Sequence, residues 1–323
     1  MAAPKLTRNI IQITSRYQRL PAREIKTMFE QGGIYADQPA WAKFIDIALL
    51  SIGLAFLTAG TIFFFAYNWQ ELHKFAKLGI AGALIVIGIA ATFFTSKNVL
   101  ISNILLTGTS VLVGLLFSVF GQIYQTGADA YDFFLGWTLF IFLWAIVADF
   151  APLWLMLILL INMTFSLYID QTGPDWPTSL ICLTLFSFNT AALILIKLLG
   201  GTKLISVVPD WFSKAVALLA VFLMTASMVS GIFASHAPEL WVIVPVACLS
   251  YAAGVYYSVR QHSLYLLCIM PLSVLVMLTA LFFQHVHWDG IFMTFFAAMF
   301  IIGTVTVLIR QLLKLNKTWN GNS

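Results

Sequence analysis

The sequence predicts an all-α fold, a polytopic transmembrane helix bundle of about ten spans behind a short amphipathic helical N-terminal segment. Three observations predict it. The chain of 323 residues is 61% hydrophobic and only 9% charged, and a soluble domain of this size has no means of burying so much apolar surface. Apolar runs long enough to cross about 30 Å of hydrocarbon recur along the chain. Loops that carry Lys and Arg alternate with loops that have almost none.

The first 45 residues are predicted to form amphipathic helices rather than a span. Between Leu6 and Leu20, apolar residues recur at helical spacing while arginines fall elsewhere on the wheel. Pro21 is suited to open a second short helix, and Gly32-Gly33 to end it. Asp37 then fits as a cap for a helix that continues into the first span. A basic amphipathic segment of this kind either lies on anionic lipid or docks a partner protein.

The chain therefore divides into a cytoplasmic amphipathic segment (1–45), a transmembrane bundle (46–309) and a cytoplasmic tail (310–323). Asn103, Asn162 and Asn189 lie inside the apolar runs, where we expect them to form hydrogen bonds between helices. The ten predicted spans are 46–67, 75–94, 99–120, 133–148, 152–169, 179–199, 215–235, 240–258, 263–283 and 289–309.

The boundary between the fourth and fifth spans is very short. Pro152 suits the first turn of a new helix, and Asp149 is placed to cap the exposed amides of that turn. We therefore predict a tight helical hairpin here. The alternative is one long kinked helix, which would invert every later loop against the charge rule.

The distribution of charge predicts the orientation. All but two of the 17 Lys and Arg residues fall at one side of the predicted membrane, and the exceptions are Lys74 and Lys77. Since basic loops stay inside, both termini are predicted to be cytoplasmic. The basic residues are too scattered to follow a phosphate backbone, so we expect lipid and no nucleic acid as the charged partner.

The sequence offers no catalytic constellation that we can recognise, and we expect no enzyme activity, no metal and no cofactor. His285 and His287 with Asp289 have a possible metal spacing, but a third strong ligand is missing. No phosphate-binding Gly-Lys loop, HExxH motif or nucleophile elbow occurs. The three cysteines fall inside apolar runs, which is not the pattern of a disulfide framework.

Two polar stretches are the candidate ligand-binding or gating elements. One follows the first span, and the other runs from Gly121 through Asp132 to a tryptophan in the fourth span. Both are predicted on the outer side, where they form either one shared site or two capped loops anchored at the interface. The candidate residues are Tyr67, Asn68, Trp69, Gln122, Tyr124, Gln125, Asp129, Asp132 and Trp137.

These stretches resemble a known family. The run Phe64-Phe65-Ala66-Tyr67-Asn68-Trp69, the GQIYQTGAD segment, Trp137 and the leader with Gly32-Gly33-Ile34 are similar to the bacterial "domain of unknown function 2157" membrane proteins, over about residues 5–150. The resemblance implies a multi-pass protein of the bacterial inner membrane. It also implies a complex with a second polytopic membrane protein and a small membrane-anchored protein, and it supplies no catalytic residues.

Three classes of function follow from these observations. We expect a non-enzymatic subunit of an envelope membrane complex. The alternative is a transporter or channel for a small or lipidic solute with an outward-facing polar site. A membrane-embedded enzyme is disfavoured because no carboxylate or histidine cluster is arranged for acid–base chemistry.

Overall fold

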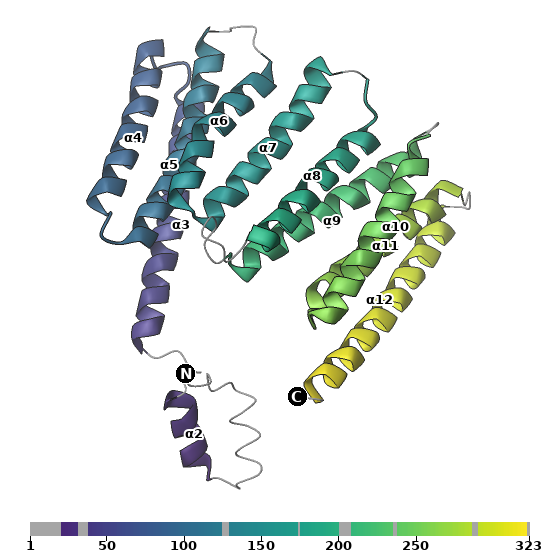
Figure 1. The fold of residues 1–323 in the computed structure, drawn as a ribbon. Coiled ribbons are helices and arrows are strands. Elements are labelled where there is room, and N and C mark those ends of the chain that lie inside the picture. The colour runs from purple at the N-terminus through teal and green to yellow at the C-terminus, as the bar shows by residue number, and fades with distance from the viewer. Residues whose placement is uncertain are drawn as a thin grey trace. The chain divides into compact units, whose positions relative to one another are not determined.

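The computed structural model describes residues 21–31, 38–124, 129–173, 175–199, 208–234, 238–285 and 290–321, and these ranges are helical apart from short turns (Figure 1). The helices are α2 (Ala22–Gln31), α3 (Gln38–Tyr67), α4 (Lys74–Phe94), α5 (Val99–Tyr124), α6 (Ala130–Ala148), α7 (Ala151–Thr172), α8 (Thr178–Leu199), α9 (Asp210–Phe233), α10 (Leu240–Arg260), α11 (Leu264–His285) and α12 (Gly290–Gly321).

Ten of the helices described, α3 to α12, are long and apolar enough to cross a membrane. The predicted all-α fold and its ten spans are therefore confirmed. The second amphipathic helix is also confirmed as α2, which lies between Pro21 and the glycine pair. The first one, around Leu6 to Leu20, falls outside the described residues. The last helix continues to Gly321, so that most of the predicted tail is helical.

The hairpin between the fourth and fifth spans is confirmed, and Asp149 lies in its turn. Asp149 ends α6 in the left-handed conformation (φ 42°, ψ 49°), and its N–H donates to the Ala145 carbonyl. Phe150, not Asp149, occupies the N-cap position of α7, while Pro152 lies in the first turn as predicted. A reversal this short needs a left-handed residue, which Asp tolerates better than most. That the Asp149 side chain caps the amides of α7 stays a prediction.

The chain forms two compact units, Met1–Leu116 and Phe117–Ser323, with the boundary inside α5. In unit 1, α3 and α4 pack with the first part of α5 through small residues. A Cβ at Gly108 would lie 2.5 Å from Leu54 Cδ2, and Gly88 faces the Thr109 side chain equally closely. Ser102 Oγ on α5 donates to the Thr92 carbonyl on α4 at 3.2 Å. The division into segments 1–45, 46–309 and 310–323 stays a prediction.

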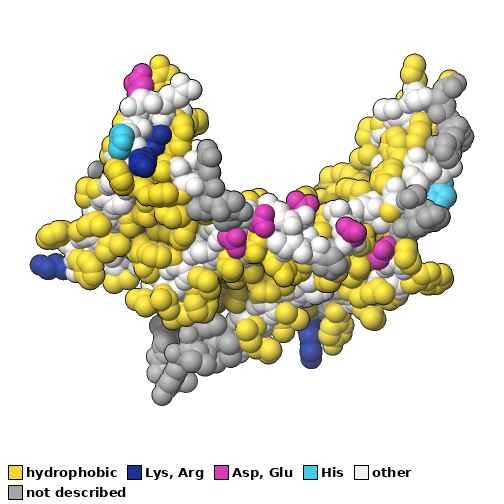
Figure 2. Space-filling model, turned by 90° about the horizontal axis from the view of Figure 1, so that it is seen from above, with side chains coloured by type: hydrophobic (Ala, Val, Ile, Leu, Met, Phe, Trp, Pro, Cys, Tyr) yellow, Lys and Arg dark blue, Asp and Glu magenta, His cyan; other side chains and the backbone are white. Residues whose placement is uncertain are grey.

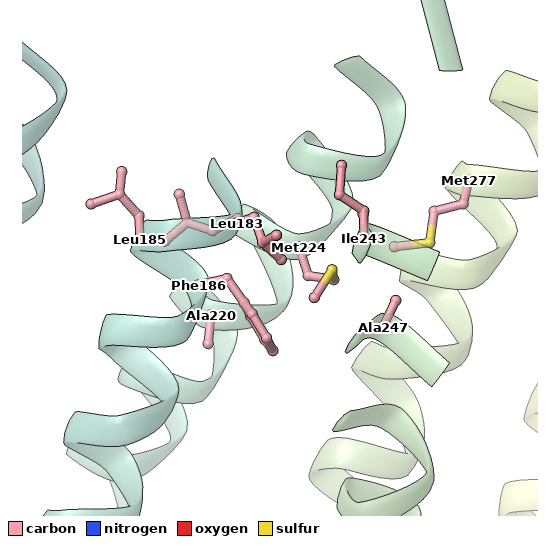
Figure 3. Close-up of a cluster of buried hydrophobic side chains, with 9 residues drawn as sticks. Leu183, Leu185, Phe186, Ala220, Met224, Ile243, Ala247 and Met277 are labelled. Carbon is pink, nitrogen blue, oxygen red and sulfur yellow. The ribbon is translucent and has the colours of Figure 1, made fainter. Parts of the chain in front are cut away.

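Unit 2 is built around α9, whose apolar window is 56% buried. Helix α9 packs against α8, α10 and α11, while α6 pairs with α7 and α11 with α12. Figure 3 shows the buried cluster at this centre, in which α8, α9, α10 and α11 each contribute apolar side chains. Its residues include Leu183, Leu185, Phe186, Ala220, Met224, Ile243, Ala247 and Met277.

Polar side chains join neighbouring helices within unit 2. Asn162 on α7 and Asn189 on α8 are both buried and exchange two amide hydrogen bonds, at 2.6 and 3.3 Å. This confirms the predicted interhelical role of the two asparagines. A second bond joins the hydroxyls of Thr138 on α6 and Thr164 on α7 at 3.2 Å.

A third group of polar contacts lies between α9, α10 and α11. Ser273 Oγ on α11 lies 2.6 Å from Thr225 Oγ1 on α9 and 2.7 Å from Tyr251 OH on α10. Satisfied hydroxyls of this kind hold helices together where apolar contacts alone give little preference over lipid.

Candidate functional site

The first candidate stretch follows α3 in unit 1, where Asn68 builds the turn. Its side-chain Nδ2 donates to the Phe64 carbonyl at 3.0 Å, and its own carbonyl accepts from the backbone N–H groups of Glu71 and Leu72 at 3.2 Å. These bonds satisfy groups that the end of α3 would otherwise leave open. Tyr67, the last residue of α3, is 91% exposed. Asn68 is thus engaged in local structure, and the Tyr67 side chain is exposed.

Trp69 forms the most specific contact of this stretch. The Nζ atom of Lys77, in the first turns of α4, lies 3.7 Å from the centroid of the Trp69 ring. Lys77 is only 7% exposed, and an aromatic face stabilises a cation in such a place. The contact closes the α3–α4 turn. Sequence analysis missed it because a tryptophan and a lysine eight residues apart across a turn have no characteristic spacing.

The second candidate stretch begins at the end of α5 in unit 2. Gln122 and Tyr124 are exposed, and the Tyr124 ring lies 4.7 Å from the Phe120 ring. Gln125 lies outside the described residues. Gly121 has a packing role, since a Cβ there would lie 2.6 Å from Phe133 Cζ on α6.

The stretch continues into the first turns of α6. Asp129 is the N-cap residue of α6 and makes no side-chain capping bond, and Asp132 is exposed in the first turn. Carboxylates at this end interact favourably with the helix dipole. Trp137 is half-buried, with its ring 5.9 Å from that of Phe134.

Two residues of α7 that the sequence did not single out hold this end of α6. The side-chain Oε1 of Gln171 accepts from the backbone N–H of Tyr131 at 3.0 Å. The rings of Tyr131 and Tyr168 meet edge to face at 5.2 Å. The α6 terminus is therefore fixed from α7, and no motif in the sequence announces this contact.

The sequence prediction required the two stretches to converge on one cleft. Tyr67, Asn68 and Trp69 belong to unit 1, whereas Gln122, Tyr124, Asp129, Asp132 and Trp137 belong to unit 2. The shared site stays a prediction.

Of the three possible metal ligands His285, His287 and Asp289, the structure describes His285. His285 Nδ1 lies 3.1 Å from the Leu281 carbonyl in its own helix. No group of three His, Cys, Asp or Glu residues suited to a metal occurs in the part of the chain that the structure describes. His287 and Asp289 lie outside it.

Acidic residues gather at one end of unit 2. Asp129 and Asp132 lie at the start of α6, Asp170 near the end of α7, and Asp175 just before α8. Viewed from above, acidic side chains form small groups on a surface that is otherwise largely hydrophobic (Figure 2).

A cavity lies near the opposite end of these helices. It has a volume of about 850 Å³ and is lined by α6, α7, α8 and the start of α9. Leu157, Ile158 and Phe212 are buried in its wall, and Asp149 is the one charged residue among the described residues that line it.

Ten apolar helices that bury polar groups in interhelical bonds define a multi-pass membrane protein embedded in a lipid bilayer. Within this class, residues 12–154 match the family described as "Predicted membrane protein (DUF2157)". The predicted resemblance is thereby confirmed over residues 12–154. No curated protein and no solved structure matches the chain.

Proposed function

We propose that this protein is a non-enzymatic subunit of a membrane complex in the bacterial inner membrane, with both termini in the cytoplasm. The observation that carries the proposal is the low burial of α3 within the family-matched region. Only 6% of the apolar window of α3 is buried, against 56% for α9. In unit 1 the helix buries Thr58 and Phe65 and little else.

The exposed side of α3 has the composition of a helix-packing surface. Gly53 and Gly60, two helical turns apart, have nothing within 4 Å of the position a Cβ would take. Small residues let the backbones of two membrane helices approach closely, and lipid alone gives no reason for them. Gly60 also lines a groove of about 340 Å³ between α3 and α4, whose other lining residues are mostly apolar.

A partner helix that packs on α3 fits these observations. The groove offers a place for a ridge of apolar side chains, and Gly53 extends the same surface by two turns toward the α3 N-terminus. The partners that the family resemblance implies, a second polytopic protein and a small membrane-anchored protein, supply such helices. The orientation rests on the alternation of basic loops.

Purification of the tagged protein from its own membranes tests the proposal. The wild-type protein should retain a membrane partner in fixed stoichiometry through affinity and size-exclusion steps in mild detergent. Gly60→Leu should weaken retention about tenfold, a loss of about 1.4 kcal/mol in binding. The matched control is Ala191→Leu, which adds the same side chain at an exposed position of α8.

Three outcomes would contradict the proposal. The first is a wild-type protein without a stoichiometric partner. The second is equal retention in the Gly60 and Ala191 variants. The third is a lower unfolding midpoint of the isolated Gly60→Leu chain, because this would put the α3 surface inside the fold.

The alternative function is a transporter or channel for a small or lipidic solute. The cavity of about 850 Å³ among α6 to α9 favours a lipidic solute over a polar one, since most of the described residues that line it are apolar. If the protein purifies without any partner, the transporter or channel becomes the better proposal.

A further inference from the structure

The cavity between α6, α7, α8 and the start of α9 is closed on its inner side and open on its outer side. The inner wall includes Leu157, Ile158 and Phe212, which are 2%, 6% and 3% exposed. Phe142 on α6 and Leu195 on α8 line it as well, yet they are 44% and 55% exposed. The cavity therefore opens sideways between α6 and α8, among exposed apolar side chains.

The cavity extends about as deep as one leaflet of a bilayer. The residues of α7 that line it run from Ala151 to Ile161, a rise of about 15 Å along the helix axis. On the facing wall, the lining residues of α8 run from Phe188 to Ile196, a rise of about 12 Å. Half of a hydrocarbon core about 30 Å thick is about 15 Å. The cavity thus reaches from the helix ends to near the midplane.

Polarity changes along this depth. Asp149 lies in the α6–α7 turn at the shallow end, and the amphipathic indoles of Trp154 and Trp211 line the same end. Deeper along α7 and α8 the lining residues are Leu157, Ile161, Phe188 and other aliphatic or aromatic side chains. One end accommodates a polar group and the rest accommodates hydrocarbon, which is the polarity of an amphiphile standing upright in the leaflet.

The depth, sideways opening and mostly apolar lining of the cavity suit a hydrocarbon chain. Water inside it would find few hydrogen-bond partners below the turn, and a void would forfeit the dispersion contacts of its walls. We propose that the cavity binds an acyl chain of a phospholipid from the leaflet that contains the α6–α7 turn, with the glycerol backbone near Asp149 and the chain along α7. In the orientation proposed above, this is the cytoplasmic leaflet. The site depends neither on a partner protein nor on transport activity.

Photolabelling of the full-length protein in vesicles tests the site. The probe is a phosphatidylethanolamine with a diazirine in the middle of one chain, incorporated into vesicles of phosphatidylethanolamine and phosphatidylglycerol. Label should concentrate on the peptides that contain Leu157–Ile161 and Phe188–Ile196. Ala192 lines the cavity, so Ala192→Trp fills part of it and should lower this labelling about tenfold, the equivalent of displacing about two methylene groups.

The neighbouring residue supplies the matched control. Ala191 is exposed and does not line the cavity, so Ala191→Trp should leave the labelling unchanged. Ala192→Leu is a graded variant with a smaller side chain, for which we expect an intermediate loss. Labelling is compared only for variants whose unfolding midpoint equals that of the wild-type protein. A misfolded variant is therefore not counted as having lost the site.

Other results would overturn the proposal. Equal labelling of the Ala191 and Ala192 variants would mean that the probe samples only the general lipid surface. Competition by free palmitate but not by unlabelled phosphatidylethanolamine would identify a fatty acid as the occupant. A crosslink between two chains at the same peptides would identify a second copy of the protein. A labelled cavity in a protein that lacks any partner supports this site while contradicting the subunit proposal.

Discussion

At the scale of single residues, the buried asparagines show how a polar group becomes a stabilising contact within a membrane. Asn189 is 0% exposed, and its Nδ2 donates both to Asn162 Oδ1 at 2.6 Å and to the Leu185 carbonyl at 2.7 Å. Asn162 Nδ2 donates in the same way to Asn189 Oδ1 and to the Ile158 carbonyl. Each side-chain amide therefore forms hydrogen bonds both with the other asparagine and with a backbone carbonyl of its own helix. Removing one leaves the other buried without its cross-helix bonds.

The first prediction follows from this reciprocity. Asn189→Ala should lower the free energy of unfolding by about 1–3 kcal/mol. The double variant with Asn162→Ala should cost less than the sum of the two single variants. We expect a coupling energy between about 0.6 and about 1.7 kcal/mol, the average and the maximum for hydrogen bonds between membrane helices. Unfolding in a detergent titration measures all three variants.

Thr184→Ala is the control for this cycle. Thr184 is exposed on α8, where its hydroxyl donates to the Leu180 carbonyl one turn back. Its loss should change stability by less than about 0.5 kcal/mol. Strict additivity of the two asparagine variants would contradict the reciprocal amide pair.

At the scale of helices, close approach of α4 and α5 depends on a particular glycine. Gly88 lies directly against the Thr109 side chain, whose hydroxyl is already bonded to the Leu105 carbonyl at 2.8 Å. Thr109 is 2% exposed, so it has little space into which to move. Gly79 lies on the same helix, yet a Cβ there would meet nothing within 4 Å.

The second prediction compares these two glycines. Gly88→Ala should destabilise the protein by about 1–3 kcal/mol, because the added methyl overpacks the contact with Thr109. Gly79→Ala should be neutral or should stabilise by about 0.5–1 kcal/mol, because alanine favours the helix and meets no neighbour. Thermal unfolding of the purified variants separates the two cases. Equal shifts of the unfolding midpoint would contradict the close α4–α5 contact.

The helices themselves follow from the sequence to a large extent, because apolar length and breaker residues determine them. The short turn before Pro152 gave two helices rather than one, as predicted. The preference of Asp for N-cap positions did not reveal that Asp149 takes the left-handed conformation at the end of α6. Helix α3 begins at Gln38, in agreement with the predicted helix that leads into the first span. Helix α12 continues beyond its predicted span, because polar residues can extend a helix once it has started.

At the scale of the whole molecule, the limits of sequence reasoning lie in contacts between distant segments. Asn162 and Asn189 were identifiable as polar residues in apolar runs. The Lys77–Trp69 contact and the hydrogen bond between Gln171 and Tyr131 could not be predicted from the sequence. Each joins two elements whose side-chain directions depend on packing. The cavity among α6 to α9 gave no signal either, because its lining residues are ordinary for membrane helices.

The orientation of the molecule rests on the distribution of Lys and Arg, and accessible loops allow a direct test. Asp175, before α8, and Gln261, after α10, are both exposed and lie in turns on opposite sides of the predicted membrane. In a background where Cys182, Cys248 and Cys268 are replaced by Ala, Asp175→Cys should react with an impermeant maleimide added to intact spheroplasts, and Gln261→Cys should not. Both should react after permeabilisation, which shows that each thiol is accessible. Labelling of Gln261→Cys alone in intact spheroplasts would invert the orientation, and with it the leaflet assigned to the cavity, because an odd number of helices separates the two turns.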